Sequence, residues 1–114
     1  MIAEMSGNHN QSLDRALAIV DAAAATGADA LKIQTFTPDS MTLDMAEGEF
    51  RITDPGSLWY GRRLHDLYAE AMTPQEWHAP IFERARQRGI VAFSTPFSEY
   101  AVELLERLDA PVYK

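Results

Sequence analysis

Hydrophobic residues divide this chain into short apolar runs separated by longer amphipathic segments. The runs are Ile2–Met5, Ala30–Phe36, Ile90–Ser94 and Pro111–Tyr113, and each has the length of a short buried strand. In the segments between them, apolar residues recur at the spacing of a helix that packs on one face. Regular alternation of strands and helices predicts an α/β fold with a parallel sheet and right-handed crossovers.

Capping signals mark where the predicted helices begin and end. Thr73, Pro74 and Glu76 match a capping box with proline at the first helical position. Gly27 and Gly89 suit the ends of two helices, because glycine adopts the left-handed conformation without strain. Four helices are predicted. The first begins after Asn10 or Ser12, the second covers Ser57–Met72, the third begins at Thr73 and the fourth begins at Ser98.

The segment Thr37–Gly56 interrupts this pattern. It is rich in proline, glycine and acidic residues, and it is too long for an ordinary connection between a strand and a helix. Loops of this length usually carry function or move, and we expect Glu47 and Glu49 within it to face solvent. The aromatic residues that follow, Trp59 and Tyr68, are expected in the core, with a ligand platform as the alternative.

Lys32 places a full charge inside the apolar run Ala30–Phe36. Because strand side chains alternate between faces, Lys32 and Gln34 share one face while Leu31 and Ile33 share the other. An ammonium group on a buried strand is costly unless an anion meets it. Polar residues at strand centres are typical of a barrel interior near its C-terminal mouth, where barrel enzymes carry out their chemistry.

These features predict that residues 1–114 form the first half of a TIM (β/α)8 barrel, with four parallel strands and intervening helices. A parallel sheet needs cover on both faces, and a complete barrel takes about 250 residues. The remainder of such a barrel is therefore expected outside the 114 residues of this chain.

Five polar residues lie in the predicted strands or at their ends and are the candidate site. Glu4 belongs to the first strand, Lys32 and Gln34 to the second, Thr95 to the third and Lys114 to the fourth. Two ammonium groups and a hydroxyl suit a clamp for phosphate or carboxylate, and Glu4 can orient a hydroxyl or move a proton. The alternatives are an internal pair between Glu4 and Lys32, a turn-capping role for Thr95 and no role for Lys114.

Charge and composition narrow the expected partners. The net charge of −7 disfavours nucleic acid and anionic membranes, while leaving room for a small anionic substrate in a locally cationic pocket. No apolar run approaches the roughly 18 residues of a membrane helix, and no signal peptide is evident. The chain has no cysteine, which fits a reducing compartment, so a cytoplasmic location is expected. His9 has no partners at metal-ligand spacing, so no metal site is predicted from it.

Four motifs in order resemble the sialic acid synthase family: Ile2–Asn10, Leu31–Thr35, Phe93–Phe97 and Pro111–Lys114. Each motif alone is weak, but four in order with fitting spacing, spread over essentially the whole chain, are specific. The middle of the chain resembles the pseudaminic acid synthase branch, although His65 and Gln75 stand where that branch commonly has tyrosine and tryptophan. The motifs of this middle part are Thr37–Asp44, Ser57–Gly61, Leu67-Tyr68 and Thr73–His78.

The resemblance implies condensation of phosphoenolpyruvate with an N-acetylated amino sugar of the 2,4-diacetamido-2,4,6-trideoxy-altrose type. It implies that Lys32 and Lys114 bind phosphoenolpyruvate and that Thr95 donates to its phosphate. It also implies that Gln34 borders the metal and the sugar, and that Glu4 lies near the reacting carbon. A divalent metal (Mn²⁺ or Mg²⁺) with ligands on later strands, a C-terminal antifreeze-like domain and a homodimer are implied for the full-length enzyme.

Several alternatives stay open at this point. N-acetylneuraminate or legionaminate synthase is the rival within the family, and Phe50–Trp59 is the candidate segment for sugar selectivity. An aldolase-type barrel would instead use Lys32 or Lys114 as a Schiff-base amine. A truncated half barrel without catalytic function is the third possibility, and the 114 residues alone are expected to be inactive.

Overall fold

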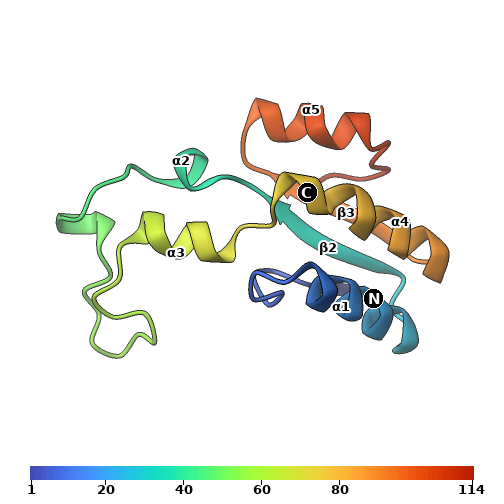
Figure 1. Ribbon diagram of the computed structural model, residues 1–114, viewed down its shortest axis with the longest axis horizontal. Coiled ribbons are helices and arrows are strands. Elements are labelled where there is room, and N and C mark those ends of the chain that lie inside the picture. Colours follow the sequence, from blue (N-terminus) through green and yellow to red (C-terminus); the bar gives the residue numbers. More distant parts are fainter.

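A parallel sheet forms the centre of the computed structural model, which describes all residues from 1 to 114. The strands are β1 (Ile2–Glu4), β2 (Ala30–Thr35) and β3 (Val91–Pro96), in the order β1-β2-β3. Both strand pairs are parallel and are linked through helices (Figure 1). The predicted α/β class and parallel sheet are confirmed.

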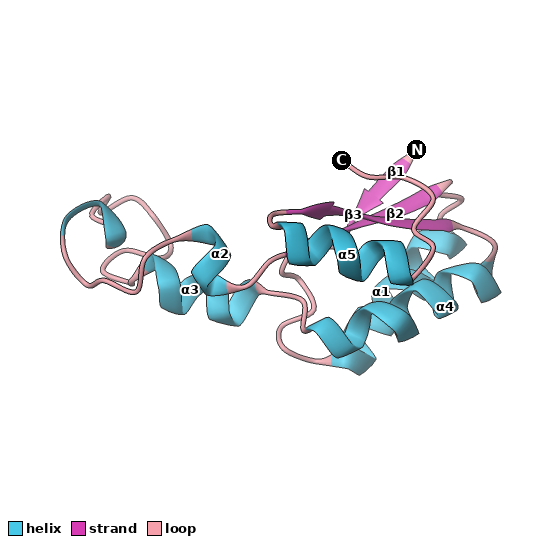
Figure 2. Ribbon diagram, turned by 90° about the horizontal axis from the view of Figure 1, so that it is seen from above, coloured by secondary structure: helices cyan, strands magenta, loops and turns pink.

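Three helices lie on the same side of this sheet (Figure 2). They are α1 (Leu13–Ala25), α4 (His78–Arg88) and α5 (Glu99–Arg107), with α1 packed against α4 and α5 beside β3. The hydroxyls of Ser12 and Ser98 cap α1 and α5 by accepting backbone N–H groups, so Ser12 rather than Asn10 is the cap of α1, and α5 begins next to Ser98 as predicted. None of the helices has the length and apolar character needed to cross a bilayer.

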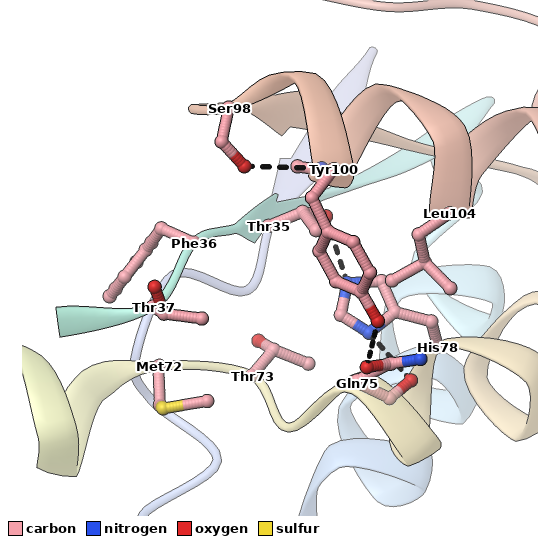
Figure 3. Close-up of a pocket in the computed structure, with 11 residues that line it drawn as sticks. Thr35, Phe36, Thr37, Met72, Thr73, Gln75, His78, Ser98, Tyr100 and Leu104 are labelled. Carbon is pink, nitrogen blue, oxygen red and sulfur yellow. Dashed lines mark hydrogen bonds between the residues drawn. The ribbon is translucent and has the colours of Figure 1, made fainter. Parts of the chain in front are cut away.

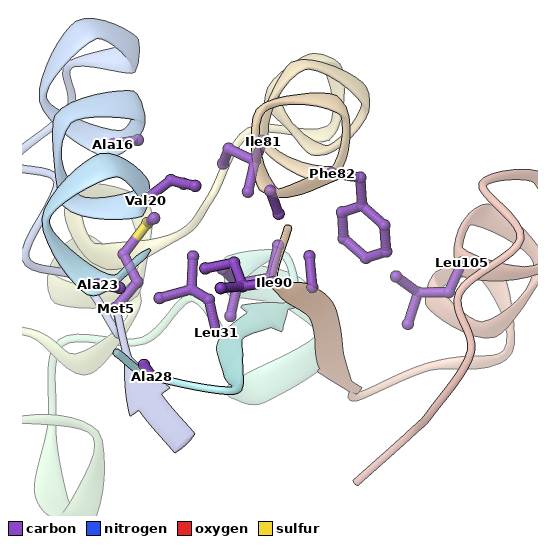
Figure 4. Close-up of a cluster of buried hydrophobic side chains, with 13 residues drawn as sticks. Met5, Ala16, Val20, Ala23, Ala28, Leu31, Ile81, Phe82, Ile90 and Leu105 are labelled. Carbon is purple, nitrogen blue, oxygen red and sulfur yellow. The ribbon is translucent and has the colours of Figure 1, made fainter. Parts of the chain in front are cut away.

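The hydrophobic core lies between the sheet and these helices (Figure 4). Leu31 and Ile33 of β2, Ile81 of α4 and Leu105 of α5 are completely buried. Residues of β2 alternate between buried and half-buried, so one face of the sheet belongs to the core. The other face carries Lys32 and its neighbours in the strands and has no helix over it (Figure 2); we call it the open face.

Between β2 and α4 the chain leaves the body and returns to it; residues 37–72 form this arm (Figure 1). An antiparallel bridge between Arg51 and Arg63 closes its outer loop. The segment that interrupts the helix and strand pattern is therefore a folded projection with short elements of its own. Its elements are α2 (Pro38–Met41), a 3-10 turn (Gly48–Phe50) and α3 (Leu64–Ala71).

Helix α3 is shorter than the predicted helix over Ser57–Met72, because a turn takes its first part. The N–H of Ile52 donates to the carbonyl of Arg62 at 2.9 Å, and the N–H of Gly61 donates to the carbonyl of Ile52 at 2.8 Å. Gly61 has a φ of +81°, which ends any helix at this point. Leu58, which lies in this turn, is 94% exposed.

The predicted capping box at Thr73 is wrong. The Thr73 side chain is buried and its hydroxyl lies 3.4 Å from Nε2 of His9, so it is turned toward the β1–α1 loop. A 3-10 turn over Gln75–Trp77 comes next, and α4 begins only at His78. A tertiary contact therefore overrides the local capping signal.

The predicted fourth strand at Pro111–Tyr113 is reduced to one isolated parallel bridge between Ser94 and Tyr113. Proline has no N–H and cannot contribute a donor to a ladder. A single backbone bond joins the last residue to the sheet, from the N–H of Lys114 to the carbonyl of Ser94 at 3.1 Å. The structure thus has three strands rather than four.

Candidate functional site

Glu4 and Lys32 lie side by side on the open face, in the row that also contains Phe93. The Lys32 ammonium is 3.1 Å from Oε1 of Glu4, so the internal pair that we considered as an alternative is present. The Lys32 side chain is only 14% exposed, whereas that of Glu4 is 52% exposed. Because a lysine ammonium has three donors, this pair leaves Lys32 able to contact an additional anion.

The next row toward the C-terminal ends of the strands holds Gln34 and Thr95, which are register partners. Lys114 follows the residue that bridges β3, so strand alternation puts its side chain beside Thr95. None of these three side chains makes a hydrogen bond or ion pair within the chain, and Thr95 does not cap a turn. All five predicted site residues therefore share the open face.

Lys32 and Lys114 are the only lysines in the sequence; every other cationic side chain is an arginine or a histidine. Glu4 is the only acidic residue that the strands contribute to the open face. This face is therefore locally cationic although the whole chain has a net charge of −7. A small anion with a carboxylate or phosphate group is the complementary ligand.

A buried chain of hydrogen bonds, absent from our sequence-based predictions, lies on the opposite face (Figure 3). His78 Nδ1–H donates to the carbonyl of Pro74 at 3.0 Å, so its Nε2 accepts from the Thr35 hydroxyl at 2.8 Å. The Thr35 oxygen lies 2.6 Å from the hydroxyl of Ser94. This neutral network ties the ends of β2 and β3 to α4, directly behind Gln34 and Thr95.

His9 is likewise buried and structural. Its Nδ1 accepts the backbone N–H of Gln11 at 3.2 Å, and its ring meets the ring of Trp77 edge-on at 5.2 Å. No group of three or more histidine, aspartate or glutamate side chains in the chain is arranged to hold a metal ion. The residues present therefore do not form a metal site of their own.

The two buried histidines predict that the chain loses stability in mild acid. Burial lowers the pKa of both His9 and His78 below the ordinary value of 6.5, because the imidazolium is poorly solvated there. Below that value the unfolded chain binds more protons than the folded chain, so stability present above pH 6.5 is lost as the pH falls toward the folded-state pKa. Urea unfolding at a series of pH values between about 5 and 8 measures the free energy of unfolding across this range. A free energy of unfolding that does not fall on the acid side would contradict it.

A cavity of about 490 Å³ lies between the β1–α1 loop and the arm. Gln34 lines it from the sheet, and Trp59 and Tyr68 line it from the arm. Trp59 is 50% exposed, so the expectation that it packs in the core is wrong. The other two cavities, of about 50 and 180 Å³, are smaller than ordinary ligand sites.

Comparisons with known proteins agree with this fold and these motifs. The NeuB family model matches residues 19–114. The whole chain is 51% identical to a pseudaminic acid synthase of Campylobacter jejuni and 48% identical to one of Helicobacter pylori, and it spans 33% of each. The fold is similar to that of an N-acetylneuraminic acid synthetase from Leptospira borgpetersenii, with a TM-score of 0.78 and 23% identity over 98% of this chain and 34% of the other.

Proposed function

The chain belongs to the NeuB family, on its pseudaminic branch, and we propose that the full-length protein condenses phosphoenolpyruvate with an N-acetylated amino sugar. The product is a nonulosonic acid of the pseudaminic type, with release of phosphate. The observation that carries this proposal is the position of Lys32 on the open face, one row from Thr95, where strand alternation also puts Lys114. A substrate with two anionic groups finds complementary charge there.

Each of the five candidate site residues has a proposed role in this reaction. C3 of phosphoenolpyruvate attacks the aldehyde carbon of the open-chain sugar, water adds at C2, and the tetrahedral intermediate loses phosphate. Lys32 and Lys114 bind the carboxylate and phosphate, and the Thr95 hydroxyl donates to the phosphate. Gln34 lies between the two substrates. Glu4, held beside Lys32, handles a proton or a sugar hydroxyl near the reacting carbon.

The proposal includes parts that this chain does not supply. A divalent manganese or magnesium ion would be held by residues outside these 114 positions, and it would polarise the sugar aldehyde. A C-terminal antifreeze-like domain, a homodimer and a cytoplasmic location complete the proposal, the last because phosphoenolpyruvate is an intracellular metabolite. The chain spans about a third of its curated relatives, so these features concern the full-length protein.

We also propose that the three strands belong to a TIM barrel whose remaining strands cover the open face. Ile2 and Val91 lie on this face and are 60% and 42% exposed, although a parallel sheet normally has cover on both faces. We expect Ile2→Ala to cost the full-length protein about 2 kcal/mol or more, as for a buried position. Leu43→Ala, on the arm and 61% exposed here, is the matched control. If Ile2→Ala and Leu43→Ala lower the free energy of unfolding by equally small amounts in chemical denaturation, the open face is not covered.

Phosphate release by the full-length protein tests the proposed reaction. The assay supplies phosphoenolpyruvate and Mn²⁺ with 2,4-diacetamido-2,4,6-trideoxy-altrose, or with N-acetylmannosamine, or with the legionaminate precursor sugar. We expect release with the first. Release with N-acetylmannosamine alone would move the protein to the neuraminate branch, and no release with any of the sugars would refute the synthase function.

A further inference from the structure

We propose that the cavity between the β1–α1 loop and the arm binds the amino sugar, and that Trp59 and Tyr68 select the sugar. This proposal rests on the proposed function and deepens it. Gln34 supports the proposal directly, because it lines the cavity and also lies beside Thr95 in the row of the open face nearest the C-terminal ends of the strands. A sugar in the cavity would therefore have one end next to an anion held by Lys32 and Lys114.

The charges of the two regions separate the two substrates. No lysine or arginine lines the cavity, and its single acidic residue, Glu70, is bound by Arg62, with Nη1 of Arg62 2.8 Å from Oε2. This arginine lowers the pKa of Glu70 through its hydrogen bonds, which keeps the carboxylate ionised and paired. Phosphoenolpyruvate consequently has its complement on the open face, whereas the cavity suits a neutral molecule.

The lining of the cavity matches the groups that distinguish a diacetamido-trideoxy sugar. The side chains of Ser6, Asn10 and Gln34 make no hydrogen bonds within the chain, so their donors and acceptors are free for acetamido groups. Opposite them, the aromatic rings of Trp59 and Tyr68 offer an apolar wall for the acetyl methyls and the deoxygenated carbon. N-acetylmannosamine would instead present hydroxyls to the apolar ring faces, away from which only the Tyr68 hydroxyl and the Trp59 indole N–H offer hydrogen bonds.

Tyr68 is held in place, which gives the wall a defined shape. Its ring packs edge-on against the ring of Phe36 at 5.7 Å, and Phe36 is itself buried directly after β2. Trp59 comes from the arm, is 50% exposed and takes part in no aromatic ring pair. Within the candidate segment Phe50–Trp59, selectivity is therefore assigned to Trp59, the one residue of that segment in the lining.

The volume of the cavity is also suitable for a sugar. At about 490 Å³ the cavity falls within the range of about 300 to 1,000 Å³ that small-molecule sites occupy. The cavity walls approach closely at Gly7, where an added Cβ would lie 3.2 Å from Cβ of Ala71. This close approach joins the β1–α1 loop to the end of α3 and keeps the two walls together.

Steady-state kinetics of the full-length protein test the proposal, with Trp59→Ala and Tyr68→Ala as variants. We expect KM for the diacetamido sugar to rise about tenfold or more in each, while KM for phosphoenolpyruvate stays within about twofold, as for loss of one anchoring contact. The ratio of kcat/KM for this sugar to kcat/KM for N-acetylmannosamine should fall in both variants. Leu58→Ala is the matched control, since Leu58 neighbours Trp59, is 94% exposed and does not line the cavity.

Calorimetric titration of the diacetamido sugar separates failure of this proposal from failure of the proposed reaction. Binding that weakens in Trp59→Ala but not in Leu58→Ala supports the sugar site even if the protein releases no phosphate. An unchanged sugar affinity in both cavity variants, or an equal loss of phosphoenolpyruvate affinity, overturns the proposal. So does the absence of any binding of the sugar to the unmodified protein.

Discussion

In the full-length protein, Lys32→Ala is expected to lower kcat/KM for phosphoenolpyruvate about 100- to 1,000-fold, as does the loss of a key charge-stabilising donor in other active sites. The substitution removes one of two cations from the open face and leaves Glu4 unpaired there, facing an anionic substrate. Stability should change little, because the partner carboxylate is half exposed and such pairs contribute little to folding. Phosphate release at varied phosphoenolpyruvate concentration measures the effect.

Two comparisons show whether Lys32 acts on the ligand or only on Glu4. Arg107→Ala removes the same charge from α5, on the far side of the sheet, and should leave kcat/KM nearly unchanged. In the double variant with Glu4→Gln, a purely structural pair would give no further loss beyond either single variant. If Lys32→Ala leaves the affinity for phosphoenolpyruvate unchanged in a calorimetric titration, Lys32 does not bind phosphoenolpyruvate.

His78→Leu is expected to reduce the free energy of unfolding by about 2–4 kcal/mol, the cost of stranding buried polar groups. Leucine cannot donate to the Pro74 carbonyl or accept from Thr35, and Thr35 is buried at 5% exposure, which leaves little room for water as a replacement. Chemical denaturation of the 114-residue chain and of the full-length protein measures the change. The acid-induced loss of stability should also become smaller, because one buried imidazole is gone.

Matched substitutions separate this effect from the loss of a histidine as such. His65→Leu removes a histidine that pairs with the exposed Asp39 on the arm, and we expect a much smaller loss of stability. Thr35→Val combined with His78→Leu should cost less than the sum of the two, since it removes both ends of one hydrogen bond. Similar losses for His65→Leu and His78→Leu would contradict the role of the buried network.

The sequence was sufficient to predict which strand residues share the open face. Strand alternation alone put Lys32 and Gln34 on a face separate from Leu31 and Ile33, and the structure has that arrangement. The motifs added Thr95, which register now aligns with Gln34. Apolar periodicity and strand alternation depend on neighbours in the chain, so they are readable without a structure.

The missed features all depend on contacts between distant parts of the chain. Thr35 and Ser94 occupy core-facing strand positions, where a hydroxyl is tolerated only because His78 supplies a partner from α4. Thr73 matches a cap locally but turns to His9, and the turn at Gly61 is stabilised by bonds from Ile52. Polar residues at the core-facing positions of two neighbouring strands were the available signal for a buried network.

The arm leaves the sheet after β2 and returns to α4 at the same end of the body (Figure 1), and this geometry bears on how such proteins diversify. Lengthening a loop whose two ends are fixed adds only a small entropic cost, so residues of the arm can change while the strands keep their pairing. Under the roles proposed above, lineages of this family would acquire new sugar preferences by mutating the arm around Trp59, while selection keeps Lys32 and Lys114 for phosphoenolpyruvate.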